Sequence, residues 1–82
     1  MYFVYILECQ NKSLYTGIAV ILKKRFKEHQ NKKGGRYTAS RPVKKIVYSE
    51  KLQTRGQALK REAEIKSLTR KKKLELISSG TK

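Results

Sequence analysis

The sequence predicts a small α/β or α+β fold in which helices flank a three-stranded sheet. Short stretches of β-forming residues are separated by turn-forming residues, and two stretches near the C-terminus have helical spacing and begin after threonines. The segments follow the order β-β-α-β-α-α without an internal repeat or a linker, which is typical of helices packed on one small sheet. The 82 residues are therefore expected to form a single domain, 1–82, close to the smallest size that folds without disulfides or metals.

The first two strands are expected to form a hairpin. Residues 1–8 carry large β-forming side chains on both faces, as in a strand that is covered on both sides. Residues 10–13, Gln-Asn-Lys-Ser, favour a turn, and residues 14–18 resume the strand pattern. Residues 43–50 have the composition of a third strand.

The hairpin register decides whether Tyr5 and Tyr15 lie on the same face of the sheet. A two-residue loop at Asn11-Lys12 would place the two tyrosines on opposite faces, because side chains alternate along a strand. A loop with an odd number of residues, or a bulge, would place them together. A functional pair of tyrosines therefore requires an odd loop.

Residues 21–31 predict the first helix. They are followed by a predicted loop over 32–42, because Gly34-Gly35 stops the helix and Pro42 favours an extended residue before it. One stripe of the helix combines apolar and polar side chains: Leu22, Arg25, Phe26 and His29.

Two further helices are predicted after the third strand. Thr54 is the expected N-cap of a helix that runs to about Leu68. Thr69 is the expected cap of a last helix through about Ser78, which Gly80 closes.

Positive charge dominates the composition. The chain has 21 Lys and Arg against six acids, a formal charge of +15, which favours a polyanion and above all nucleic acid as partner. An acidic membrane is a weaker alternative, because no predicted helix combines a bulky aromatic face with a basic face. No protein partner is evident from the sequence.

Cysteine and histidine are almost absent. Cys9 is the only cysteine and His29 the only histidine, so neither an intramolecular disulfide nor a zinc cluster of such residues is expected. No leader-like segment and no apolar run of membrane-spanning length is present. A reduced, cytoplasmic protein is the expectation.

The acidic residues limit the metal chemistry. All six acids are glutamates and the chain has no aspartate, whereas two-metal nucleases gather several carboxylates around their ions. A metal site is therefore expected to use one carboxylate, with water and phosphate completing its coordination.

Glu62 lies at an unusual position in the predicted 54–68 helix. It comes four residues after Ala58 and three before Ile65, at the edge of the apolar stripe, whereas Arg61 and Glu64 are expected to face solvent. A carboxylate drawn toward a core costs several kcal/mol unless a cation meets it. The cation would be a metal ion or, in the alternative interpretation, a lysine or arginine.

Arg25 and His29 lie four residues apart and share one face of the first predicted helix. A lone histidine on such a helix is most often a surface or capping residue, and a buried tyrosine most often packs in the core with its hydroxyl hydrogen-bonded. The functional interpretation depends on whether these residues converge with Glu62.

The same residues resemble the GIY-YIG nuclease superfamily, and within it the small stand-alone bacterial branch. The resemblance covers nearly the whole chain. It is carried by Val4-Tyr5-Ile6, Tyr15-Thr16-Gly17, the helical stretches 22–29 and 58–66, and the segments 36–38 and 42–50.

The resemblance implies the GIY-YIG fold, a three-stranded antiparallel sheet flanked by helices, and one divalent metal ion, Mg²⁺ or else Mn²⁺. By motif position it implies catalytic roles for Tyr5, Tyr15, Arg25, His29 and Glu62, with Glu62 as the metal ligand and Gly17 as a structural glycine.

Each implied role suits the side chain. Arg25 would neutralise charge on the phosphoryl group, Tyr15 would position water or phosphate, and Tyr5 would help to activate the attacking water. His29 would relay or accept a proton. The sequence leaves open whether Tyr5 or His29 is the general base, because tyrosine needs its pKa lowered from about 10 and histidine does not.

The predicted function is a metal-dependent endonuclease that hydrolyses phosphodiester bonds in DNA. The alternative is a non-catalytic module on the same scaffold that binds DNA or RNA. Binding is expected to rest on contacts with the nucleic-acid backbone rather than on base recognition. The residues predicted to make those contacts are Lys23, Lys32, Lys33, Arg36, Tyr37, Arg41, Arg70, Lys71 and Lys72.

Overall fold

The computed structural model describes residues 1–30 and 43–80, and their element order confirms the predicted β-β-α-β-α-α arrangement. The predicted loop 32–42 lies wholly outside the described residues. The third strand runs two residues further than predicted, and the last helix includes Gly80 instead of stopping before it. The elements are β1 (Tyr2–Cys9), β2 (Leu14–Ala19), α1 (Leu22–Gln30), β3 (Val43–Leu52), α3 (Arg55–Lys66) and α4 (Arg70–Gly80).

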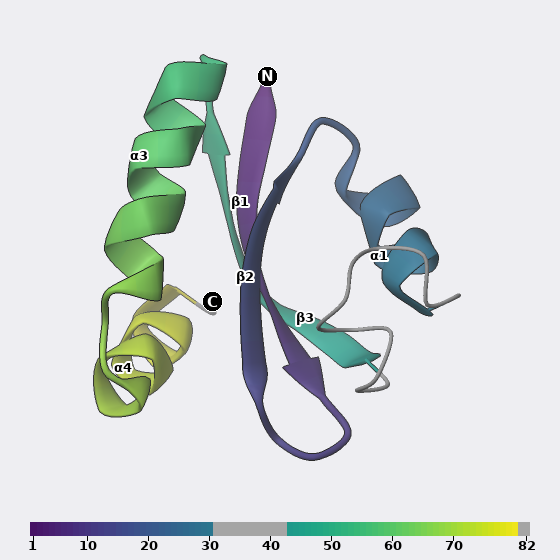
Figure 1. Cartoon of the computed structure of the whole chain (residues 1–82), viewed down its shortest axis with the longest axis vertical. Coiled ribbons are helices and arrows are strands. Elements are labelled where there is room, and N and C mark those ends of the chain that lie inside the picture. The colour runs from purple at the N-terminus through teal and green to yellow at the C-terminus, as the bar shows by residue number, and fades with distance from the viewer. Residues whose placement is uncertain (31–42, 81–82) are drawn as a thin grey trace.

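The three strands form an antiparallel sheet in the order β2-β1-β3, with β1 in the centre. Figure 1 shows α3 and α4 on one face of this sheet and α1 on the other. Because both faces are covered, both alternating sets of β1 side chains are buried, as the sequence predicted. Val4 and Ile6 pack with Ala58 and Ile65 on the α3 face, while Tyr5 faces α1.

The β1–β2 hairpin has the odd loop that a tyrosine pair requires. Tyr5 pairs with Gly17 and Leu7 with Tyr15, so Tyr5 and Tyr15 lie on the same face. The loop comprises residues 10–12, and the backbone N–H of Lys12 donates to the Cys9 carbonyl at 2.8 Å. Lys12 adopts a positive φ of 69°, the left-handed residue that closes three-residue hairpin loops.

Both predicted helix caps are present. The Thr54 hydroxyl accepts a hydrogen bond from the backbone N–H of Gln57 at 3.1 Å, and the Gln57 side chain accepts from the Thr54 N–H at 3.3 Å. The Thr69 hydroxyl accepts from the Lys72 N–H at 3.2 Å. These caps satisfy N–H groups that a helix start leaves without partners, so each helix begins where the sequence predicted.

A charged cluster attaches α3 to β3. The Arg61 Nε donates to the two carboxylate oxygens of Glu50 at 3.0 and 2.8 Å, and the Tyr48 hydroxyl donates to the same carboxylate. The prediction that Arg61 faces solvent was wrong, because its partner comes from a strand eleven residues earlier in the chain. Two-point pairing of this kind fixes the helix against the sheet.

No helix within residues 1–30 and 43–80 combines the length and the apolar character needed to cross a membrane.

Candidate active site

The centre of the site is a hydrogen bond between Tyr5 on β1 and His29 near the end of α1. The Tyr5 Oη and His29 Nε2 atoms are 2.8 Å apart. Both side chains are 1% exposed. The strand in the middle of the sheet and the helix on its face therefore meet through two polar groups that satisfy each other away from solvent.

Gly17 makes room for the Tyr5 ring. A Cβ atom at residue 17 would lie 2.6 Å from the Tyr5 Oη, 2.8 Å from its Cζ and 3.1 Å from Cε2 of Tyr15. Only a residue without a side chain allows both tyrosines to lie this close to β2. The structural role predicted for Gly17 thus has a steric reason.

Tyr15 completes a cluster of three rings. Its ring centroid lies 5.1 Å from that of His29 at an interplanar angle of 62°, and 6.4 Å from that of Tyr5. The Tyr5 and His29 rings meet at 65° with centroids 5.9 Å apart. Edge-to-face contacts of this kind are favourable and hold the rings in fixed orientations.

Arg25 lies one turn before His29 on α1 and supplies positive charge to the cluster. Its Nη1 atom is 3.1 Å from Oε1 of Glu28, and both side chains are partly exposed. The guanidinium also interacts with the Tyr5 hydroxyl. Arg25 therefore lies between the buried tyrosine and the surface.

The environment shifts the pKa values of the two hydrogen-bonded groups in opposite directions. Burial raises the pKa of Tyr5 to about 12, although Arg25 opposes the shift. Burial and the positive charge of Arg25 lower the pKa of His29. At neutral pH the Tyr5 hydroxyl is protonated and His29 is neutral, and in the tautomer that carries its proton on Nδ1 the imidazole accepts from Tyr5 through Nε2.

Glu62 lies at the edge of the buried stripe of α3, as predicted. Its side chain is 18% exposed, and its Oε2 is 3.5 Å from Nζ of Lys66, which is mostly exposed. This ion pair is the predicted alternative to a metal, but a pair with a solvent-exposed lysine contributes little and can be exchanged. Glu62 belongs to the helix on the other face of the sheet, yet its negative charge adds to the raised pKa of Tyr5.

The described residues offer a metal no large cluster of ligating side chains. No group of three or more His, Cys, Asp or Glu side chains occurs within residues 1–30 and 43–80. Mg²⁺ is commonly held by one or two carboxylates together with waters and substrate phosphates, so Glu62 fits a metal of this type. Lys66 would then give up its place beside Glu62.

Those predicted nucleic-acid-binding residues that the structure describes do not lie on a single face of the protein. Lys23 is exposed on α1, whereas Arg70, Lys71 and Lys72 are exposed at the start of α4, on the other face of the sheet (Figure 1). The Arg70 guanidinium donates to the Lys12 carbonyl at 2.8 Å, at the hairpin loop. The other predicted contacts lie outside the described residues: Lys32, Lys33, Arg36, Tyr37 and Arg41.

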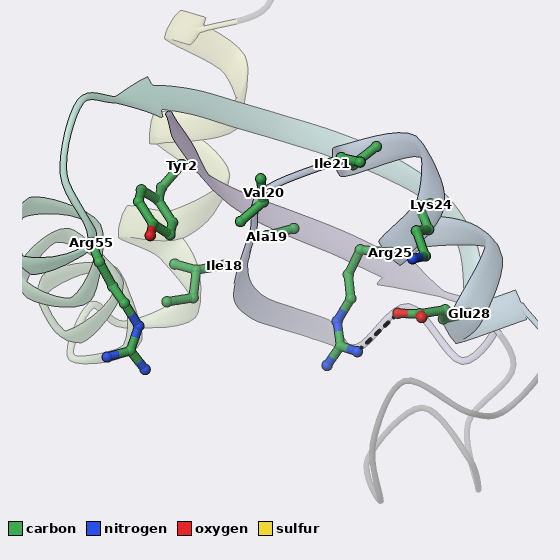
Figure 2. Close-up of a pocket in the computed structure, with 9 residues that line it drawn as sticks. All are labelled: Tyr2, Ile18, Ala19, Val20, Ile21, Lys24, Arg25, Glu28 and Arg55. Atoms are coloured by element: carbon green, nitrogen blue, oxygen red, sulfur yellow. Dashed lines mark hydrogen bonds and ion pairs between the residues drawn. The ribbon is translucent and has the colours of Figure 1, made fainter.

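Sequence reasoning missed a groove beside the ring cluster. Lys24, Arg25 and Arg55 contribute positive charge to it, and Figure 2 shows that they come from α1 and from the start of α3. Lys24 and Arg55 are far apart in the sequence, so no local pattern joins them. The available signal in the sequence was the apolar run at residues 18–21, of which Val20 and Ile21 are exposed in the structure.

These features together define a catalytic domain of one known class. Residues 1–75 match the family model described as the GIY-YIG catalytic domain, and the chain belongs to the GIY-YIG family. The match includes every residue of the ring cluster as well as Arg25 and Glu62. Members of this family are nucleases that act on nucleic acid and generally use a divalent metal ion.

Within the family, the chain is similar to the small stand-alone UPF0213 proteins. It is 47% identical over 79 residues to one from Staphylococcus saprophyticus, covering 96% of each chain. It is 45% identical over 80 residues to one from Haloquadratum walsbyi, covering 98% of this chain and 90% of that protein. The solution NMR structure of a UPF0213 protein from Bacillus halodurans has a TM-score of 0.61 at 39% identity, covering 95% of this chain and 84% of that one.

Proposed function

We propose that the protein is a metal-dependent endonuclease that hydrolyses phosphodiester bonds in DNA. The observation that carries this proposal is the 2.8 Å hydrogen bond between Tyr5 Oη and His29 Nε2. It joins a tyrosine whose pKa is raised to about 12 to a histidine whose pKa is lowered. A neutral imidazole whose Nε2 is hydrogen-bonded to a hydroxyl can accept a proton at neutral pH.

The hydrogen-bonded pair supports a proton path in which His29 is the base. His29 accepts the hydroxyl proton of Tyr5 through Nε2 while the Tyr5 oxygen takes a proton from the attacking water. Tyr5 loses one proton and gains one, so it is again a neutral phenol, and His29 becomes the imidazolium. His29 is thus the general base, and Tyr5 transmits the proton, because a phenol with a pKa near 12 is a poor base by itself.

The remaining residues act on the phosphate and on the metal. Arg25 leaves Glu28 to neutralise charge that grows on the phosphoryl oxygens, for which its forked geometry is suited. Tyr15 positions the water or the phosphate beside His29. Glu62 would hold Mg²⁺ or Mn²⁺, which supplies Lewis-acid stabilisation of the phosphate and the leaving group when bound.

The test is cleavage of labelled single-stranded, duplex, flap and four-way DNA, and of RNA, with Mg²⁺, Mn²⁺ or EDTA. Glu62→Gln is the critical variant, and Glu64→Gln is its matched control because it removes a carboxylate from an exposed position of the same helix. We expect metal-dependent cleavage that is lost in Glu62→Gln and retained in Glu64→Gln. Equal cleavage by the two variants would overturn the assignment of Glu62.

One observation favours a second function, a non-catalytic nucleic-acid-binding module. Tyr5 and His29 are each 1% exposed, which is also what a purely structural hydrogen bond requires. Under this function every substrate in the panel is bound and none is cleaved with any metal. Metal-dependent turnover of a single substrate that Glu62→Gln abolishes would exclude it.

A further inference from the structure

A groove of about 430 Å³ lies where β2 ends and α1 begins. Its size is within the range of about 300–1,000 Å³ that is typical of small-ligand sites. In Figure 2, α1 contributes one side, and the other side comes from Tyr2 on β1 and Arg55 at the start of α3. Arg25 lines the groove and also interacts with Tyr5 of the ring cluster, so the groove adjoins the candidate active site.

The floor of the groove is apolar and open to solvent. Ile18, Ala19, Val20 and Ile21 line it, and Val20 and Ile21 are 60% and 59% exposed. The Tyr2 ring, which packs against the apolar core, adds an aromatic surface to the groove. A contiguous exposed apolar surface with a charged rim marks a binding site more often than it marks ordinary surface.

The rim is positive and partly unpaired. Arg55 and Lys24 make no ion pair within residues 1–30 and 43–80, and Glu28, the acid of the lining, is already held by Arg25. In Figure 2 the Arg55 and Arg25 side chains lie apart, with Ile18 between them, and their guanidinium groups point the same way. Two cations that flank an apolar surface complement a flat apolar group linked to phosphates on both sides.

We propose that this groove binds one unpaired nucleotide next to the phosphate that is cleaved, so that the substrate is a single strand or a single-stranded segment. The base lies on the apolar floor and the Tyr2 ring, and the flanking phosphates lie on Arg25 and Arg55. This proposal rests on the proposed nuclease function and specifies its substrate. DNA and RNA share the chemistry, and the test separates them.

Duplex DNA does not fit the same groove without distortion. A paired base is stacked and its flat faces are covered, so it reaches an apolar groove only after it has been flipped out, at a cost of a few kcal/mol. An unpaired base pays least of this cost, and stacking on aromatic and apolar side chains favours any base. The groove therefore discriminates by strand structure and not by sequence.

The test measures binding in EDTA, where no cleavage occurs, by fluorescence anisotropy at one fixed salt concentration. The probes are a 12-nucleotide DNA strand, the same strand with abasic sites at its central positions, the corresponding RNA strand, and the 12-base-pair duplex. The groove variants are Val20→Ser with Ile21→Ser, and Arg55→Gln. Their matched controls are Leu74→Ser, an exposed apolar residue on α4, and Lys60→Gln, an exposed cation on α3.

We expect the Kd of the intact DNA strand to be lower than that of its abasic counterpart by about fivefold or more, as base stacking implies. Val20→Ser with Ile21→Ser should remove that difference, and Arg55→Gln should weaken the intact strand more than Lys60→Gln does. If the groove variants weaken binding of the RNA strand more than binding of the DNA strand, the nucleotide that the groove binds belongs to RNA. Leu74→Ser should behave as the unsubstituted protein.

Equal affinity for the intact and abasic strands would overturn the proposal, because binding would then be electrostatic alone. A change of sedimentation mass on Val20→Ser with Ile21→Ser would overturn it too, because the apolar floor would then be a contact between two copies of the chain. The nuclease function is judged separately by metal-dependent cleavage. Tighter binding of the intact strand than of the abasic strand, without cleavage of any substrate, would support the groove as a nucleotide-binding site and refute the nuclease function.

Discussion

Two tyrosines in this fold have raised pKa values and hydrogen-bonded hydroxyls, yet their surroundings differ in kind. Tyr48 donates to Glu50, whose carboxylate is held by Arg61, so two full charges are balanced within the protein. Tyr5 is hydrogen-bonded to a neutral imidazole whose own pKa is lowered. The first arrangement fixes α3 to the sheet, and the second contains a group that can accept a proton.

The comparison shows that a buried tyrosine hydroxyl alone does not indicate chemistry. Although burial acts against ionisation, Arg61 and Tyr48 hold the pKa of Glu50 below its ordinary value, so this carboxylate stays ionised and paired at neutral pH. Glu50 therefore does not take up the Tyr48 proton at neutral pH. What distinguishes the candidate site is the partner of the tyrosine and not the tyrosine.

The sharpest way to break the comparison is to remove each hydroxyl in turn. Tyr5→Phe should lower cleavage by about 10²- to 10⁴-fold, because the proton path from water to His29 is lost. Tyr48→Phe should leave cleavage nearly unchanged and lower stability by about 0.5–1.5 kcal/mol. Single-turnover cleavage and urea unfolding of both variants would measure this, and equal loss of cleavage in both would contradict it.

Gly17→Ala tests whether the ring cluster depends on close approach to β2. The new methyl group would lie 2.6 Å from the Tyr5 Oη, so the ring must move away from His29. We expect a loss of about 1–3 kcal/mol of stability together with a marked loss of cleavage. Gly56→Ala is the matched control, because a Cβ there meets only the Thr54 Oγ1 at 4.0 Å. Unchanged cleavage by folded Gly17→Ala protein would refute the steric role.

Arg61→Gln tests the structural side of the comparison. Without the guanidinium, the partly buried Glu50 carboxylate loses its charged partner, and we expect stability to fall by about 1–2 kcal/mol. Lys60→Gln removes a charge from an exposed neighbouring position and should have little effect. Urea unfolding compares the two variants. Equal midpoints would show that the cluster does not hold α3 in place.

The smallest expected effect is the pH dependence of stability that His29 causes. Its folded pKa is lowered, so the unfolded chain binds a proton more readily as pH falls below about 6.5. Stability should therefore fall as pH decreases from about 6.5, by at most about 1.4 kcal/mol per pH unit. His29→Gln should lack this component in urea unfolding between pH 7 and 5. A slope that persists unchanged in the variant would assign it to other groups.

Features that depend on neighbours in the sequence were predictable. Thr54 and Thr69 reveal two helix starts because a cap needs only the next three residues. The same holds for the position of Glu62, which follows from helical spacing. The strand segments and their order followed from residue type and from turn residues.

Features that depend on distant residues were not predictable. Spacing alone placed Arg61 in solvent because nothing local indicates that β3 brings Glu50 to it. The hairpin register stayed open because Lys12, a residue that rarely adopts a positive φ, closes the loop. The groove at Val20 and Ile21 joins the end of β2 to the start of α3, 36 residues later, so only the folded chain reveals it.

The three-residue loop at 10–12 has a consequence for how this chain can vary. Residues paired across two antiparallel strands share a face, so Tyr15 keeps its place beside Tyr5 for as long as it stays paired with Leu7, whatever the length of the loop. A slip of the pairing by one residue, to the register that a two-residue loop at Asn11-Lys12 would give, would turn Tyr15 to the opposite face from Tyr5 and bring Thr16 to the Tyr5 face. Such a protein would keep its strands and lose the contact between its aromatic rings, so the turn constrains the site through the register that it selects.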